Sequence, residues 1–270
     1  MLNKETIETL SKADAIRAAN QLDGLRPELI ALPDDFTLHD TEDKQPTRRR
    51  QRGTFLTSSI DSLCEYVEHH AENGATVFVS DDMKAKAVLN LGNQDAPGHA
   101  DNIAQLALVK TAAFDAVSSI NGQQRTQKEV AEFFEDCSEH LQFYQGADLL
   151  PSRQAIAAVR QLTIEGVRKL ESTTAQLSET RSSFEQVTAS SKEPIPELVY
   201  FKCTPYEGLE ERTFVLRVSI LTTDDKPRLV LRIQRLQLHV EQMASELAQT
   251  VSDQLVANSI SVVRGTYARG

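Results

Sequence analysis

A histidine and a carboxylate two residues apart stand in a glycine-containing loop, at His99 and Asp101 of the phrase PGHAD. Such a pair can move a proton to or from a substrate, or can bind a metal ion. The other histidines have no zinc-like spacing to this loop, and it lacks a second pair of ligands. Short polar motifs usually hold a turn through their own hydrogen bonds, so we favour a structural loop over a catalytic one.

The strongest basic cluster of the chain is of a type that contacts phosphates. Four arginines, Arg48, Arg49, Arg50 and Arg52, lie in the phrase RRRQRGTF, directly after an acidic stretch between residues 28 and 43. Segregated charge of this kind is typical of a solvated connection whose two halves attract one another, and we favour that interpretation. The alternative is an arm that contacts a partner.

A second basic set is expected on a β-sheet. Residues 198–203, 213–221 and 228–234 predict three strands, and alternation sends the apolar side chains of the last two to one face. The opposite face then carries a mixed set of polar, basic and aromatic residues: Tyr200, Lys202, Arg217, Ser219, Arg228 and Arg232. Cations beside an aromatic ring suit single-stranded nucleic acid, because cations meet phosphates and the ring stacks on a base. An ordinary solvent-facing surface is the favoured alternative.

The composition is that of a globular protein. The chain has 270 residues, with 40% hydrophobic and 25% charged residues and a net charge of −10. The acidic balance argues against non-specific binding of duplex DNA over the whole surface but allows a local basic site. No apolar run is long enough for a membrane helix or a signal peptide, so we expect a cytoplasmic protein. The three cysteines are far apart, which predicts reduced, buried thiols and no metal or cofactor.

The elements that must position these residues begin with a weakly amphipathic helix at 3–20. A strand at 53–57 then leads into a helix that we expect to begin with a capping box of Ser58 and Asp61 and to run to about residue 72. Further predicted strands lie at 75–80, 86–91 and 103–110, the first two as a hairpin, and a short helix lies at 112–120.

In the second half, a capping box of Thr126 and Glu129 opens a helix whose apolar face extends to Leu141. Another helix follows Pro151. Residues 171–191 fit a heptad poorly, because about half of them are Ser or Thr, and we favour a polar hairpin there. The three C-terminal strands precede a helix of about 20 residues, which we expect to cover their apolar face, and a short strand at 261–263.

Together these elements predict an α+β protein with mixed antiparallel sheets, packed helices and a C-terminal β-β-β-α unit. We expect an N-terminal helix and extended arm at 1–53, an α/β half at 54–150 and a β-rich half at 151–270, with 54–270 forming one compact body.

Several phrases resemble a known family when they are taken together. They are RRRQRGTF, ATVFVSDDMKAKAVLNLG, APGHADN, KTAAF, AEFFED and SSKEPIPE. The chain resembles the YfdQ-like family of phage and prophage proteins, a domain of unknown function, over nearly its whole length. The resemblance implies a place among early phage genes, near genes of nucleic-acid metabolism or recombination. It implies no catalytic residue. The β-β-β-α order is also similar to the core of phage single-strand annealing proteins, by topology alone.

The sequence therefore favours a non-enzymatic phage accessory factor that binds single-stranded DNA as a homo-oligomer, through the four arginines and the basic sheet face. One alternative is a structural protein that assembles into a ring or shell through its first helix and arm. The other is a metal-dependent hydrolase or nuclease that uses His99 and Asp101.

Overall fold

The computed structural model describes residues 3–20, 42–162, 194–221 and 227–268, and the chain divides into two compact units, residues 1–51 and 52–270. The fold class is α+β, as predicted. In the first unit, helix α1 spans Lys4–Asn20 and the 3-10 helix η1 spans Glu42–Lys44. The hairpin predicted at 171–191 lies outside the described residues.

A mixed five-stranded sheet has the strand order β1-β4-β3-β2-β11. The strands are β1 (Gly53–Thr57), β2 (Thr76–Ser80), β3 (Lys84–Val88), β4 (Asn102–Ala107) and β11 (Ser261–Arg264). β2 and β3 form the predicted hairpin, β4 pairs antiparallel with β3, and β1 and β11 add as parallel edge strands. The strand predicted at 86–91 begins earlier and ends at Val88, because the chain turns at Asn90 into the following loop.

Helix α2 (Ile60–His70) covers one face of this sheet. Its N-cap is Ser59, whose Oγ accepts a hydrogen bond from the Ser62 N–H at 3.3 Å. The predicted capping box of Ser58 and Asp61 is therefore wrong by one residue. The apolar stripe that predicted the helix is confirmed, because it is the buried face: Ile60, Leu63, Cys64 and Val67.

The second sheet has six strands, all antiparallel, in the order β5-β10-β9-β8-β6-β7. They are β5 (Gln124–Thr126), β6 (Leu141–Gln145), β7 (Asp148–Leu150), β8 (Leu198–Cys203), β9 (Arg212–Leu221) and β10 (Arg228–Ile233). The last three confirm the predicted C-terminal strands. β6 and β7 were not predicted. Leu141 begins β6, so its assignment to the preceding helix is wrong.

Three helices cover one face of the second sheet: α3 (Ala112–Ile120), α4 (Gln127–Asp136) and α5 (Ser152–Arg160). The predicted capping box of Thr126 and Glu129 is present at the start of α4, while the 3-10 helix η2 (Ser138–His140) follows its end. Aromatic rings join these helices to the strands. Phe114 of α3 stacks on Phe214 of β9 with centroids 5.0 Å apart, and the face is buried as the alternation predicted.

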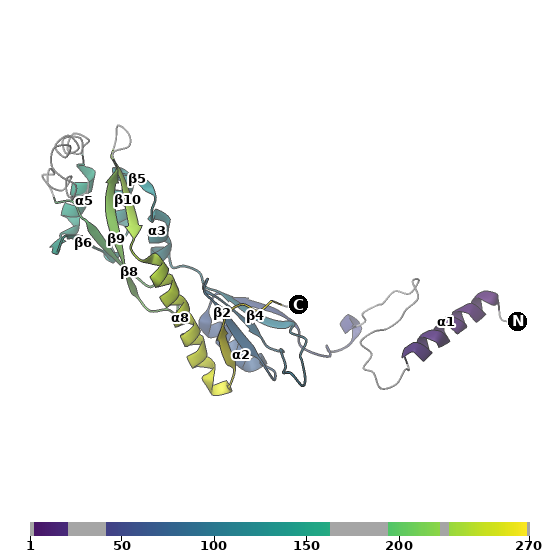
Figure 1. Cartoon of the computed structure of the whole chain (residues 1–270). Coiled ribbons are helices and arrows are strands. Elements are labelled where there is room, and N and C mark those ends of the chain that lie inside the picture. Colours follow the sequence, from purple (N-terminus) through teal and green to yellow (C-terminus); the bar gives the residue numbers. More distant parts are fainter. Residues whose placement is uncertain (1–2, 21–41, 163–193, 222–226, 269–270) are drawn as a thin grey trace, which may run out of the picture. The chain divides into compact units, whose positions relative to one another are not determined.

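The long helix α8 (Leu236–Leu255) packs on the first sheet instead of covering the second. It contacts β2, β11 and α2, and the 3-10 helix η3 (Val256–Asn258) leads from it into β11 (Figure 1). The predicted cover of the second sheet by this helix is therefore wrong. The apolar face of that sheet is already occupied by α3, α4 and α5. The first half of α8 reaches the sheet at β9, where the ring centroids of His239 and Phe214 lie 4.9 Å apart and Arg212 forms an ion pair with Glu246.

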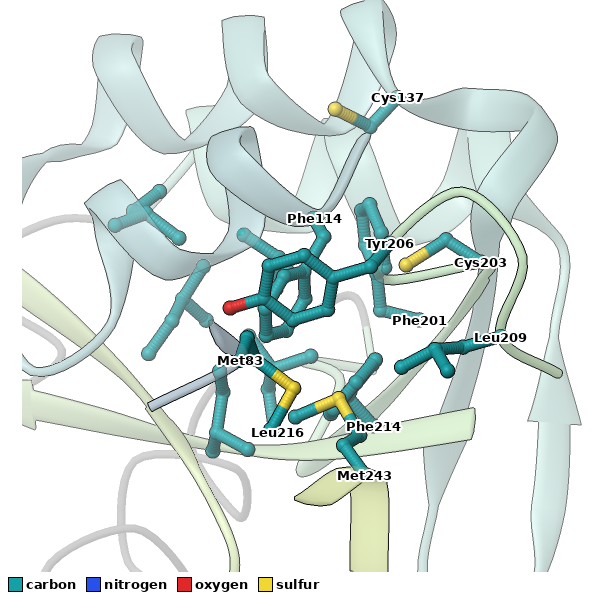
Figure 2. Packing of buried hydrophobic residues seen from close by; sticks show 14 of the residues in the cluster. Met83, Phe114, Cys137, Phe201, Cys203, Tyr206, Leu209, Phe214, Leu216 and Met243 are labelled. Carbon is teal, nitrogen blue, oxygen red and sulfur yellow. The ribbon is translucent and has the colours of Figure 1, made fainter. Parts of the chain in front are cut away.

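A buried cluster joins the two sheets. Met83 comes from the β2–β3 turn, Tyr206 and Leu209 from the loop after β8, and Met243 from α8 (Figure 2). Their side chains gather around the Tyr206 ring, beside Phe114, and all are at least nine-tenths buried. The described residues of the second unit thus share one continuous hydrophobic core.

Candidate nucleic-acid interface

The face of the second sheet that no described helix covers carries the polar, basic and aromatic residues that the alternation pattern selected. Along β9 the even-numbered side chains are buried and the odd-numbered ones, including Arg217, face away from the helices. Even-numbered residues of β8 and β10 pair with them on the same side. The structure therefore brings all six predicted strand residues to one face: Tyr200, Lys202, Arg217, Ser219, Arg228 and Arg232.

One register row crosses five strands of this face. It runs from Arg232 on β10 to Arg217 on β9, Leu198 on β8, Tyr144 on β6 and Leu149 on β7. Neighbouring strands lie about 4.8 Å apart, so Arg217 and Tyr144, two strands from one another, are separated by about 10 Å. A single extended polymer can touch both ends of such a row.

The two arginines at the start of the row face one another directly. Arg217 and Arg232 are paired across the antiparallel strands β9 and β10, and both side chains are exposed. Within the described residues, neither forms an ion pair with a carboxylate. Directly opposed like charges destabilise a sheet, because their side chains lie within about 5.5 Å of one another. This local cost is offset when an anion lies between the two guanidinium groups.

Two tyrosines form an aromatic platform on the same face. The rings of Tyr144 and Tyr200 have centroids 4.7 Å apart and are tilted by 41°. Tyr200 lies on β8, opposite Val215 of β9 and Gln142 of β6. Both rings are half-buried, so each keeps an open surface on which a flat base can stack.

Lys202 and Arg228 contribute less to this surface. The Lys202 ammonium forms an ion pair with Glu211 at 2.5 Å, so its charge is already partly neutralised. Arg228 pairs with Leu221 and Thr126 at the far end of β10, four residues from Arg232. The centre of the candidate interface is therefore the pair Arg217 and Arg232 with the pair Tyr144 and Tyr200.

Three of the four arginines of the arm lie in the first compact unit, and Arg52 is the first residue of the second. Arg48 and Arg49 are exposed, while Arg50 and Arg52 are half-buried and make interactions of their own. The Arg49 backbone N–H donates to a carboxylate oxygen of Glu42 at 3.2 Å, so the acidic and basic parts of the arm do contact one another locally. The contact is made by the backbone and not by the guanidinium group, so the attraction between the two charged halves stays a prediction.

The loop with His99 and Asp101 is held by a buried amide. Asn90 is 5% exposed, and its side-chain oxygen accepts hydrogen bonds from the backbone N–H groups of Asp101 and Asn102, at 3.1 and 3.0 Å. Its side-chain nitrogen donates to the Asp101 carboxylate at 2.9 Å, whereas His99 is exposed. The carboxylate therefore has a structural role as an anchor of the loop.

Gly98 allows the same loop to close. A Cβ at Gly98 would lie 2.0 Å from the carbonyl oxygen of Asn90, so a side chain there would force the loop open. The arrangement agrees with the loop interpretation favoured above.

The cysteines and the acidic residues offer no obvious chemistry. Burial raises the pKa of Cys64 to about 11 and of Cys203 to about 12, and raises the pKa of Cys137 too. Thiols with such pKa values are protonated at neutral pH and are poor nucleophiles. In the described part of the chain, no three His, Cys, Asp or Glu side chains gather as a metal-binding group.

Tyr144 is the residue of the interface that the sequence did not indicate. It lies on β6, in LQFYQ, where Leu141 and Phe143 point inward and Tyr144 points outward. The sequence signal for this strand was the short alternation of apolar and polar residues, followed by Gly146. This glycine has a φ of 58° and allows the turn into β7.

Comparison with known proteins gives one match. A family model described as an uncharacterized conserved protein (DUF2303) matches residues 3–267. No curated protein and no solved structure matches the chain. Among the described residues, no helix is both long and apolar enough to cross a membrane.

Proposed function

The chain belongs to the uncharacterized conserved protein family DUF2303, and we propose that it is a non-enzymatic protein that binds single-stranded DNA on the outer face of its second sheet. The observation that carries this proposal is the opposed pair of Arg217 and Arg232, which has no carboxylate partner among the described residues. Phosphates bind between the two guanidinium groups, and bases stack on Tyr144 and Tyr200.

We propose further that the protein is a YfdQ-like phage or prophage accessory factor in recombination or replication. The support is the resemblance of its sequence phrases to that family, together with a surface of cations and aromatic rings, which suits single strands of any sequence. The exposed arginines Arg48 and Arg49 would add phosphate contacts. Binding without sequence preference is the behaviour that strand exchange and replication require.

Homo-oligomer formation through α1 belongs to the same proposal. Ile7 and Leu10 lie three residues apart on this helix and are 54% and 57% exposed. Apolar side chains at this spacing share one helix face, which can pack on the same face of a second copy. The full chain should therefore be larger than a monomer in light scattering, and Ile7→Lys with Leu10→Lys should reduce it to the monomer mass. An unchanged mass would exclude α1 as the contact.

The binding test uses fluorescence anisotropy of a labelled oligothymidylate with the full chain. The double variant Arg217→Gln and Arg232→Gln should bind much more weakly. The slope of the logarithm of its binding constant against the logarithm of the salt concentration should also be shallower by about 1.4. Each phosphate contact on a single strand contributes about 0.7 to this slope, and the variant loses two contacts. Tyr144→Leu should weaken binding by about 1–3 kcal/mol, the usual value of one stacked base.

The matched control is Lys128→Gln with Arg153→Gln. Both are exposed cations on the helices that cover the opposite face of the sheet, so this control makes the same change in net charge. It should bind almost as the unmodified protein does. Equal losses in the two double variants would show that binding follows net charge alone, and the proposal would then be rejected.

A further inference from the structure

A pocket of about 490 Å³ lies on the outer face of the first sheet, which is unrelated to the interface proposed above. Residues 265–267 follow β11 and form part of the wall of this pocket, together with residues of strands β1 to β4. Gly265 allows this path: its N–H still bonds to the Val79 carbonyl at 2.8 Å, and its φ of 142° is one that other residues rarely adopt.

The shape of the pocket follows from the register of the sheet. One row across the outer face carries the large side chains Gln105, Lys86 and Phe78, and the next row carries the small residues Ala107 and Ser80 beside Lys84. The small side chains leave a hollow between taller walls. A volume in this range is typical of sites for small organic ligands.

Aromatic rings form one side of the hollow. The Tyr267 ring lies 5.2 Å from the Phe78 ring, tilted by 31°. Lys86 holds the tail in place, because its Nζ donates to the Tyr267 carbonyl at 3.1 Å and lies 5.4 Å from the centre of the Tyr267 ring.

The pocket carries one unbalanced positive charge. Its lining includes two ammonium groups, on Lys84 and Lys86, and one carboxylate, on Asp82. The Asp82 carboxylate binds Lys84 and accepts from Ser80, which together lower its pKa and keep it ionised. Lys86, in contrast, meets only a neutral carbonyl and a ring among the described residues. A half-buried ammonium without a carboxylate partner favours an anionic ligand.

We propose that this pocket binds a small organic anion with a flat ring, of the size of a nucleoside monophosphate. The anionic group binds the Lys86 ammonium, beside Lys84, and the flat ring packs against Tyr267 and Phe78. The anionic group of such a ligand matches the ammonium groups of the pocket wall, and its flat ring matches the aromatic rings of the wall.

The experiment titrates the full chain with adenosine 5′-monophosphate in a calorimeter, with inorganic phosphate and adenosine as separate arms. Each fragment should bind at least about tenfold more weakly than the nucleotide, because each makes only one of the two contacts. Lys86→Met and Tyr267→Leu should each weaken nucleotide binding by about tenfold. If phosphate alone binds as tightly as the nucleotide, or if both variants bind normally, the proposal is wrong.

Lys110→Met is the matched control, because the Lys110 ammonium also lies over a ring, 5.5 Å from the centre of Phe114, but outside the pocket. It should leave nucleotide binding unchanged. Arg217→Gln with Arg232→Gln should also leave it unchanged, which separates this site from the sheet surface proposed for DNA.

A second measurement needs no variant. The nucleotide should slow acetylation of Lys86 in the unmodified protein, read by mass spectrometry, while Lys110 reacts at its usual rate. A Lys86 that reacts equally fast with and without saturating nucleotide would overturn the proposal even if the Lys86 variant failed to fold.

Discussion

Arg217 and Arg232 repel one another in the free protein, so removing their charges should stabilise the fold. We expect Arg217→Gln with Arg232→Gln to raise the free energy of unfolding by a few tenths to about 1 kcal/mol, the size of a cross-strand pair effect. Urea denaturation followed by circular dichroism measures this. A gain in stability together with a loss of DNA binding would indicate a surface kept for a ligand at the expense of the fold. A loss of stability would mean that the arginines support the sheet instead.

His239 makes stability depend on pH. Burial and the nearby Arg212 lower its pKa from the usual 6.5, and its Nδ1 is buried without a hydrogen-bond partner in the described structure. The unfolded chain therefore binds a proton more readily than the folded one. This contribution to stability is complete above pH 6.5 and is lost as the pH falls below it, toward the lowered pKa.

The melting temperature should accordingly fall between pH 7.5 and 5.5, and His239→Phe should reduce that fall because phenylalanine keeps the contact with the Phe214 ring without a titrating group. The exposed His99→Gln variant is the control and should behave as the unmodified protein does. An identical pH dependence in the His239 variant would assign the effect to other groups.

For individual residues, the sequence predicted which side chains share a face of the sheet but not which of them are neighbours across the strands. The period of two placed Arg217 and Arg232 on one side of the sheet. Their direct opposition depends on the register between β9 and β10, which no local pattern contained. Tyr144 required a further strand from a distant part of the chain to reach Tyr200.

Among the elements, the start of α2 offers a comparison of two adjacent serines. Ser59→Ala removes the side chain that accepts from Ser62 and should cost about 1 kcal/mol. Ser58→Ala removes no cap and should stay within about 0.5 kcal/mol. Thermal unfolding of the two single variants decides between them. A larger loss at Ser58 would restore the capping box that the sequence pattern indicated.

Elements with strong periodicity were predicted well, and those made by distant pairing were not. The stripe of α8, with Leu247 and Val251 buried, indicated a helix, but its partner was misassigned. Three helices from the middle of the chain already cover the second sheet, and the alternation of β9 and β10 contains no information about which helix packs there. The packing of α8 beside β2 and β11 is a tertiary contact that no local sequence pattern indicates.

For the whole molecule, the cluster around Tyr206 should make the two sheets unfold together. Met243 is 1% exposed in that cluster, and Met243→Ala should cost about 2–5 kcal/mol through the cavity it leaves. Hydrogen exchange should show a similar loss of protection in β2 and in β9, one strand from each sheet. Loss confined to one sheet would mean that the two unfold separately.

Leu238→Ala is the control from the same helix, since Leu238 is 45% exposed and its truncation should change stability by less than about 0.5 kcal/mol. A comparable loss at Leu238 would mean that truncating any apolar side chain of α8, and not a cavity in the buried cluster, explains the Met243 result.

The order of the strands also constrains how the protein can be made. β11 completes the first sheet by pairing with β2, about 185 residues earlier in the chain. On the ribosome, β2 is synthesised long before its partner, and its outer edge remains open until residues 261–264 have left the exit tunnel. During that interval the nascent chain has an unpaired edge strand, the kind of surface that chaperones protect and that other chains can join. Completion of the sheet therefore waits for residues 261–264 to be translated.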